Sequence, residues 1–219
     1  MAVALGLLPD RALLADVNSH LIHFYQWIQD GLMIDIDMRN DRDCFDAARR
    51  RFNSLIAAGK AGCDEAAGLF YYLNRTCFNG LCRFNRSGEY NVPFGRYKTI
   101  NYIRDFTGYQ PVLSRWEVLR RDFEELDLLP EDFIYADPPY DVEFRQYSSG
   151  GFTWDDQVRL ARWLAEHPGP VVASNQATDR VLDLYRELGF SLDTRLAPRL
   201  IACNGDRTQA MEMVATLHL

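Results

Sequence analysis

The sequence predicts an α/β protein in which a largely parallel sheet is covered by helices and carries an inserted helical lobe. Short apolar runs alternate with helically spaced apolar residues towards both ends of the chain, whereas residues 31–99 lack this alternation. The 219 residues, 47% of them hydrophobic and 25% charged, suffice for one sizeable core and a small second lobe. We therefore expect residues 1–30 and 100–219 to form one α/β domain, with residues 31–99 as its insert.

The first half of the chain predicts a strand, three helices and a turn-rich segment. Residues 11–16 are a candidate buried strand, and Asn18 is placed to cap the helix that follows. Residues 43–72 indicate two helices, because the glycines within residues 59–62 interrupt the helical pattern. Asparagine–glycine and serine–glycine pairs then favour a hairpin or a long ordered loop over residues 76–97.

The second half returns to alternating strands and helices. Thr153 is placed to cap a helix that runs to about residue 166, with Asp156 completing a capping box. Another helix, which begins near Val181, is stopped by Gly189. The expected strands are residues 116–121, 132–136, 170–174, 193–197 and 211–218, and the last two are expected to form an antiparallel pair.

The charge distribution bears on the partners of the protein. The net charge of −7 argues against a surface coated in basic residues, yet residues 74–98 alone carry +4 and the rest of the chain −11. A compact basic segment on an acidic body favours a localised contact with a polyanion. On charge alone, a solvated loop with scattered arginines is the commoner explanation.

Other residue classes indicate a cytoplasmic protein without a metal. No apolar run approaches the length of a membrane span. The five cysteines show no paired spacing, which favours reduced thiols. His20 and His23 lie three apart on an expected helix, but no acidic or cysteine partner is near them in the sequence. We therefore expect solvent-facing histidines, not metal ligands.

The tetrapeptide Asp137-Pro138-Pro139-Tyr140 follows the strand of residues 132–136, at the edge where open α/β sheets bind ligands. The exocyclic amine of adenine is a poor nucleophile, because its lone pair is delocalised into the ring. The Asp137 carboxylate and the Pro138 carbonyl are able to accept its hydrogens, which aims the lone pair at an electrophilic methyl group and stabilises the growing positive charge. Tyr140 offers a ring for an extruded base. A tight proline-rich turn is the alternative, which the preceding strand disfavours.

Further segments occur in a fixed order around this box: Ala15-Asp16-x-Asn18-Ser19-x-Leu21-Ile22, residues 74–85, residues 88–98, Phe152-Thr153-x-x-x-Gln157, Ser174-Asn175 and Asn204-Gly205-x-Arg207. This series resembles the Dam-type (D12 class) DNA adenine N6-methyltransferases. The resemblance implies a Rossmann-like sheet that uses S-adenosylmethionine, with residues 31–99 as a helical target-recognition lobe. It further implies transfer of a methyl group to the N6 amine of adenine in double-stranded DNA, by base flipping, at GATC-like sites. Phage, restriction-modification and housekeeping roles are all open.

The resemblance also implies roles for individual residues. Asp16 is similar to the acid that binds the cofactor ribose, Asp122 and Phe123 resemble the segment beside the cofactor adenine, and Asp137 lies near its methionine end. Asp137, Pro138 and Tyr140 take the catalytic roles described above. The residues implied to bind DNA are Phe78 beside the flipped base, Leu81, Arg83 and Pro93 for reading bases, Arg75, Asn85, Asn91, Arg96 and Lys98 for phosphates, and Asn79, for which no more specific role is implied.

The front of the sequence departs from the family pattern. Family members begin with a lysine-bearing segment and a Phe-x-Gly-x-Gly turn that hold the cofactor, whereas residues 1–7 resemble the helix after that turn. We expect a truncated reading frame. The alternatives are a fragment that is completed by a missing segment or a second chain, and a degenerate enzyme. For the function, the alternatives are a catalytically inactive DNA-binding remnant and a cytosine N4-methyltransferase, whose chemistry uses the same box.

Overall fold

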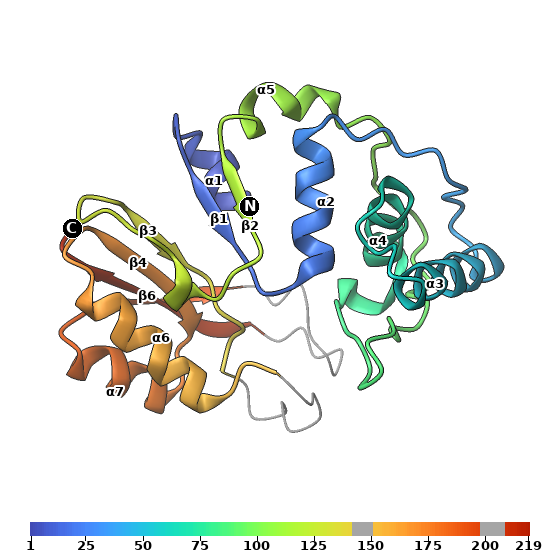
Figure 1. Cartoon of the computed structure of the whole chain (residues 1–219). Coiled ribbons are helices and arrows are strands. Elements are labelled where there is room, and N and C mark those ends of the chain that lie inside the picture. The colour runs from blue at the N-terminus through green and yellow to red at the C-terminus, as the bar shows by residue number, and fades with distance from the viewer. Residues whose placement is uncertain (142–150, 198–208) are drawn as a thin grey trace. The chain divides into compact units, whose positions relative to one another are not determined.

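The computed structural model describes residues 1–141, 151–197 and 209–219 of a mixed α/β chain (Figure 1). Residues Met1–Glu125 form one compact unit and residues Leu126–Leu219 form a second.

The first unit contains a two-stranded parallel sheet. Strand β1 (Leu13–Ala15) pairs with strand β2 (Glu117–Leu119). Helix α1 (Ala2–Leu7) precedes β1, and helix α2 (Ser19–Gln29) follows it. Because both strands run in the same direction, the residues that follow them lie at one edge of the sheet.

Most of the first unit lies between β1 and β2 in the sequence and is helical. It contains the α-helices α3 (Arg42–Ala57), α4 (Asp64–Thr76) and α5 (Gln110–Leu113), and the 3-10 helices η1 (Phe78–Gly80) and η2 (Thr107–Tyr109); a third 3-10 helix, η3 (Phe123–Glu125), follows β2. Aromatic rings fill the core beneath these helices: Phe45, Phe52 and Phe70 are at most 4% exposed. Burial of these rings stabilises the packing of α2 and α3 against α4.

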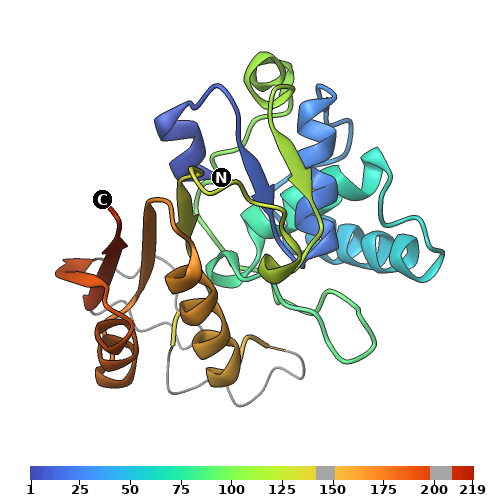
Figure 2. The ribbon, with the colours of Figure 1, turned by 60° about the vertical axis from the view of Figure 1, so that its left-hand side comes forward.

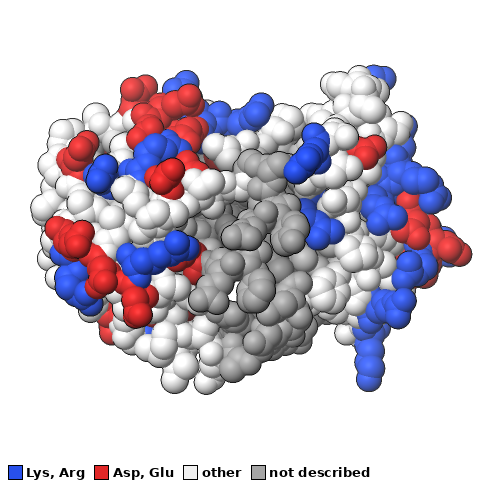
Figure 3. All heavy atoms as spheres, turned by 90° about the horizontal axis from the view of Figure 1, so that it is seen from below, with Lys and Arg blue, Asp and Glu red and all other residues white. Residues whose placement is uncertain are grey.

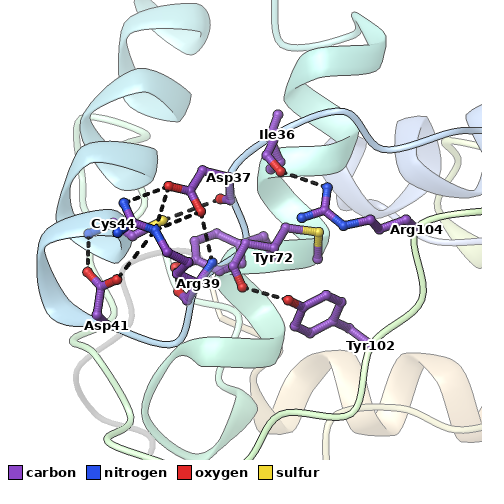
Figure 4. Close-up of polar contacts among 9 residues, drawn as sticks. Ile36, Asp37, Arg39, Asp41, Cys44, Tyr72, Tyr102 and Arg104 are labelled. Atoms are coloured by element: carbon purple, nitrogen blue, oxygen red, sulfur yellow. Dashed lines mark hydrogen bonds and ion pairs between the residues drawn. The ribbon is translucent and has the colours of Figure 1, made fainter.

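The segment of residues 34–41 has no regular structure but is held through its backbone carbonyl groups (Figure 4). The hydroxyl of Tyr72, on α4, donates to the carbonyl of Arg39 at 2.6 Å. The hydroxyl of Tyr102 donates to the carbonyl of Met38 at 2.8 Å. These bonds satisfy carbonyl groups that a regular element would otherwise pair, so the segment keeps one conformation.

The second unit contains a four-stranded sheet in the order β3-β4-β6-β5. Its strands are β3 (Ile134–Ala136), β4 (Val171–Gln176), β5 (Ser191–Ala197) and β6 (Ala210–Leu217). Strands β3 and β4 are parallel, and β6 runs antiparallel to both of its neighbours. Helices α6 (Trp154–Glu166) and α7 (Asp179–Glu187) lie side by side on one side of this sheet (Figures 1 and 2).

Most predicted elements are present with small shifts at their ends. The two helices expected in residues 43–72 are confirmed, and the second continues to Thr76. The capping box of Thr153 and Asp156 at the start of α6 is also confirmed, as is the final antiparallel pair, β5 with β6. The described strands form two sheets, so the expectation of one largely parallel sheet is not confirmed. The last strand returns between β4 and β5 and therefore runs against both.

The expectation of a solvent-facing His20 was wrong. Its ring stacks on Phe84 with centroids 4.7 Å apart and meets the edge of Phe52 at 5.2 Å. Burial among these rings lowers the pKa of His20. The ring of His23 lies against Gly62. In the described residues, no group of three or more His, Cys, Asp or Glu side chains is placed to hold a metal ion.

Two other expectations concern membrane-spanning segments and the cysteine thiols. No helix within the described ranges is long and apolar enough to cross a membrane. The four cysteines of those ranges, Cys44, Cys63, Cys77 and Cys82, are free thiols, as predicted. Cys203 lies outside the described residues.

Candidate active site and nucleic-acid interface

The Asp137 carboxylate lies at the carboxyl end of β3, beside Ser174 of the neighbouring strand. The Ser174 hydroxyl donates to Asp137 Oδ1 at 2.8 Å, and the hydroxyl of Tyr135 lies 3.2 Å from the same serine oxygen. Since Ser174 has one hydrogen and gives it to the carboxylate, Tyr135 is the donor in the second bond. Within the described ranges, Asp137 Oδ2 accepts no hydrogen bond, and the side chain is exposed. One carboxylate oxygen is thus fixed and the other is free to accept a substrate N–H.

The two other residues expected to act on the substrate flank Pro139. Pro138 is buried and Tyr140 is half-buried. Burial raises the pKa of the Tyr140 phenol, a hydrogen bond with Ser174 offsets part of the rise, and the charge of Asp137 adds to it. Tyr140 is therefore neutral near pH 7.

Two buried amide side chains, those of Gln157 and Asn175, form hydrogen bonds to the backbone of the loop of residues 137–141. Gln157, on α6, donates through Nε2 to the carbonyl of Pro139 at 2.7 Å. Asn175, on β4, donates through Nδ2 to Gln157 Oε1 at 2.9 Å and accepts the backbone N–H of Asp141 at 3.1 Å. Gln157 is 3% exposed and Asn175 is fully buried, so these bonds are shielded from water.

An ion pair between Asp141 and Arg180 also holds this loop. The Asp141 carboxylate, 8% exposed, accepts from Nε of Arg180 at 2.6 Å and from the Thr178 hydroxyl at 3.0 Å, and Arg180 Nη2 also binds it. The Arg180 guanidinium lies over the Trp154 ring, 4.5 Å from its centroid. The loop of residues 137–141 is therefore tied to β4, α6 and α7.

The residues expected to contact the cofactor follow adjacent strands of the other sheet. Asp16 comes directly after β1 and accepts the backbone N–H of Asn18 at 2.7 Å. Asp122 lies three residues after β2, and its carboxylate accepts the backbone N–H of Glu124 at 3.1 Å; Phe123 begins η3. Parallel strands bring Asp16 and Asp122 to the same sheet edge. A carboxylate fixed at a strand end is able to accept hydrogen bonds from the ribose hydroxyls of a nucleoside, so these side chains fit S-adenosylmethionine.

The predicted hairpin is present at residues 83–91. Phe84 and Tyr90 form an antiparallel bridge, and the turn between them is closed by Asn85. The Asn85 side-chain oxygen accepts the backbone N–H groups of Ser87 and Glu89, both at 2.9 Å. Asn85, which we expected at a phosphate, thus shapes the turn of the free protein.

Arg83 and Asn91, expected to contact a base and a phosphate, face each other across this hairpin. Arg83 Nε donates to Asn91 Oδ1 at 2.8 Å, and its Nη2 donates to the Asn91 backbone carbonyl at 3.1 Å. Both side chains are exposed. Because the Nε–Nη2 edge of the guanidinium binds Asn91, the Nη1 group and the second Nη2 hydrogen point away from the asparagine.

The remaining DNA-binding candidates lie at the base of the hairpin and in the irregular segment that follows it. Phe78 is 37% exposed, and its backbone N–H donates to the carbonyl of Pro93 at 2.8 Å. Asn79 adopts a left-handed conformation with φ 53°. Gly95 passes so close to Cys77 that a Cβ atom would lie 2.5 Å from the Cys77 carbonyl oxygen. Any side chain at position 95 would push the segment around Gly95 away from Cys77.

The basic residues of this segment occupy different environments. Arg75, in the last turn of α4, binds the backbone carbonyl of Asn101. Arg96 and Lys98 are exposed, Arg96 with φ 54°, and Leu81 is half-buried. On the face drawn in Figure 3, basic side chains gather over the first unit, whereas both signs intersperse over the second.

Half-buried side chains anchor the hairpin to α3 and to the segment of residues 34–41. Asn53, on α3, brackets Tyr90: its Oδ1 accepts the Tyr90 N–H at 2.8 Å, and its Nδ2 donates to the Tyr90 carbonyl at 3.1 Å. Arg49 donates to the carbonyl of Val92 at 3.3 Å, and Asn40 donates to that of Tyr97 at 2.6 Å.

The sequence did not predict several residues of the site. Ser174, Asn175 and Gln157 were noted as family positions without a role, and Asp141 and Arg180 were not noted. A buried polar residue in a strand, such as Asn175, is the one signal that was available. The Asn204-Gly205-x-Arg207 motif lies outside the described residues.

Comparisons with known proteins show the family of this chain. The family model described as D12 class N6 adenine-specific DNA methyltransferase matches residues 1–196. The chain is 32% identical, over 96% of its length, to a DNA adenine methylase of Vibrio cholerae, of which it covers 82%. It is 29% identical, over 90% of its length, to the type II methyltransferase M.MjaIII of Methanocaldococcus jannaschii, of which it covers 76%. It is also 32% identical, over 89% of its length, to a DNA N-6-adenine-methyltransferase of Escherichia phage P1, but it spans only 28% of that protein.

Proposed function

This chain belongs to the D12 class N6 adenine-specific DNA methyltransferase family, and we propose that it transfers a methyl group to the N6 amine of an adenine flipped out of duplex DNA. The observation that carries the proposal is the Asp137 carboxylate, of which one oxygen is fixed by Ser174 and the other is free. S-Adenosylmethionine, when bound, supplies the methyl group.

The residues of the loop act on the amine in complementary ways. Asp137 Oδ2 and the Pro138 carbonyl accept its two hydrogens, which draws the nitrogen towards a pyramidal geometry and exposes its lone pair. The negative carboxylate stabilises the positive charge that develops on nitrogen. The Tyr140 ring stacks on the flipped base. The roles of Asp16, Asp122 and Phe123 are to hold the ribose and adenine of the cofactor.

We propose that the chain is a Rossmann-like catalytic domain of residues 1–30 and 100–219, with residues 31–99 as a target-recognition insert. The pairing of β1 with β2 supports this arrangement, because helices α3 and α4 lie between these two adjacent parallel strands in the sequence. The basic hairpin on that insert favours Leu81, Arg83 and Pro93 as the residues that read a GATC-like site in double-stranded DNA, with Phe78 beside the flipped base. A cytoplasmic location is consistent with the free thiols.

The glycine turn of the cofactor site is proposed to come from a further segment of this protein or from a second chain. Among the described strands, β1 pairs only with β2, and β3 pairs only with β4. Each therefore has one edge on which another strand is able to pair.

Two alternative functions remain distinct from this proposal. A cytosine N4-methyltransferase would use the same four-residue box, but the family match is to adenine-specific enzymes. A DNA-binding protein without catalysis would keep the hairpin and its anchors but show no turnover.

Asp137→Ala, in a protein that includes the glycine-turn segment, tests the proposal, with methylation of GATC duplexes measured by transfer of labelled methyl groups. We expect turnover to be lost and DNA binding to be retained, since Asp137 acts on the amine and not on the phosphates. Asp193→Ala, an exposed acid on β5, is the matched control and should keep full turnover. Near wild-type turnover by Asp137→Ala would refute the assignment.

A further inference from the structure

We propose that Gln157 and Asn175 are positioning residues for methyl transfer, because their side-chain amides form a relay that fixes the backbone on both sides of Tyr140. This inference rests on the function proposed above, in which the Tyr140 ring holds the flipped base.

The relay binds the two peptide groups that flank Tyr140. The carbonyl of Pro139, on one side, accepts from Gln157 Nε2 at 2.7 Å. The N–H of Asp141, on the other side, donates to Asn175 Oδ1 at 3.1 Å. With both neighbouring peptide planes held, φ and ψ of Tyr140 are restricted and the direction of its ring is set.

The relay has a single direction. Gln157 must present its NH2 group to the Pro139 carbonyl, so its oxygen faces Asn175. Asn175 must then present its NH2 group to that oxygen, at 2.9 Å, which leaves its own oxygen for the N–H of Asp141. Reversing either amide would set two acceptors or two donors against each other in a buried site.

The surroundings add rigidity to the relay. Asn175 Oδ1 also accepts the backbone N–H of Gln176 at 2.8 Å, and Asp141 is held by Arg180. Gln157 and Asn175 are 3% and 0% exposed, so water does not compete for their bonds. Neither side chain touches the substrate in this arrangement; both act through Tyr140.

Replacing either amide by the acid of the same shape separates positioning from packing. In Asn175→Asp and Gln157→Glu, an ionised carboxylate has no hydrogen to donate, so the relay breaks. The neutral carboxylic acid has one O–H group and restores the missing donation. Burial favours the neutral acid, which moves its titration towards neutral pH. The charged groups on the surrounding elements are Asp137, Asp141 with Arg180, Asp156 with Arg159, and Glu212.

The first measurement is methylation of GATC duplexes, as a function of pH, by the protein completed with the glycine-turn segment. At alkaline pH we expect kcat of Asn175→Asp and of Gln157→Glu to be lower than that of wild type by about 10- to 100-fold, because the ring is misplaced. The ratio to wild type should rise towards one as the pH falls. KM for DNA should change little, since phosphate contacts dominate binding. Gln209→Glu, an exposed amide-to-acid change on the same unit, should keep a constant ratio.

The second measurement needs neither cofactor nor DNA. Hydrogen exchange of the Asp141 backbone amide should be slow in wild type and much faster in Asn175→Ala, which removes its acceptor. Thermal unfolding at each pH identifies the conditions in which every variant is folded, and only those are compared.

The outcomes distinguish this inference from the proposed function. A variant-to-wild-type ratio of kcat that does not depend on pH, or an Asp141 exchange rate unchanged by Asn175→Ala, would overturn the relay. A wild-type protein that is completed with the glycine-turn segment and still does not methylate DNA would contradict the proposed function, and the exchange measurement would still decide whether the relay fixes the backbone at Tyr140.

Discussion

The loop of residues 137–141 and the hairpin of residues 83–91 are held in opposite ways. The loop is tied by side chains that water does not reach, above all Asn175 and Gln157. The polar side chains of the hairpin, such as Arg83 and Asn91, are exposed and bind mainly one another. Only the underside of the hairpin is anchored in the core, through Tyr90.

This difference matches what each region must do. A group that acts on a reacting atom has to be in place before the substrate arrives, because positioning it during the reaction costs rate. Exposed hydrogen bonds contribute little net energy, so they are readily exchanged for bonds to DNA. The loop is thus preorganised by burial, whereas the hairpin tip is available for exchange.

The largest effect is expected where the hairpin meets the core. Gly95→Ala places a Cβ atom against the Cys77 carbonyl oxygen and should lower the free energy of unfolding by about 2–3 kcal/mol. Gly88→Ala, at the hairpin tip, meets no atom within 4 Å. Only its φ of +76° should lower the free energy of unfolding, by about 1 kcal/mol. Chemical denaturation of both variants measures the difference. Equal losses would show that the base of the hairpin is no more rigid than its tip.

The second prediction concerns base reading. Arg83→Ala should reduce discrimination at one base pair of the GATC site by about 1–3 kcal/mol. If Asn91 orients the guanidinium, Asn91→Ala should relax the same base pair, and the double variant should lose less than the sum of the two single losses. Binding to GATC and singly substituted duplexes, with cofactor or an analogue present, provides the test.

A uniform loss of affinity of Arg83→Ala for all duplexes would contradict a role of Arg83 in base reading. Additive losses would instead leave Asn91 as an independent phosphate contact. Both results would weaken the contrast between an exchangeable hairpin and a fixed loop.

The third prediction concerns the support of the loop. Asp141→Ala removes the carboxylate that binds Arg180 and Thr178 and should lower the free energy of unfolding by about 1–2 kcal/mol. The lower part of that range is expected, because 54% of the Arg180 side chain is exposed and solvent screens the pair. Asp183→Ala, whose ion pair with Arg186 is exposed on both sides, is the control and should change stability very little. Equal values for the two variants would argue that burial does not strengthen the loop.

The fourth prediction separates a phosphate contact from base reading. Arg96→Ala should weaken binding to all duplexes alike and lower the slope of log affinity against log salt by about one unit. Titration at several salt concentrations measures the slope. A sequence-dependent loss would move Arg96 into the base-reading group with Arg83.

The smallest effect is expected from His20, which joins α2 to the hairpin through Phe84. Its pKa is lowered in the folded state, so the unfolded chain binds the proton more tightly. Stability should therefore fall as the pH drops below about 6.5, the value of an unperturbed histidine. His20→Phe keeps the stacking and should show a shallower acid-side loss in thermal unfolding. An identical acid limb in the two proteins would contradict the effect of burial on His20.

Much of this protein follows from local sequence. Helical spacing and the Thr153–Asp156 capping box specify α6, and turn residues specify the hairpin, because these signals act between residues close together in the chain. The chemistry required of Asp137 and Tyr140 likewise follows from their residue types and from the strand that precedes them.

The tertiary structure determined which distant side chains contact the site and the hairpin. Asn175 and Gln157 are 18 positions apart, and nothing in their local sequence links either to Pro139 or Asp141. The pairing of Arg83 with Asn91 also requires the hairpin register, and the stacking of His20 on Phe84 requires α2 to pack against the hairpin. Local propensity depends on neighbours in the chain, whereas hydrogen bonds of buried side chains depend on which distant elements folding brings within about 3 Å.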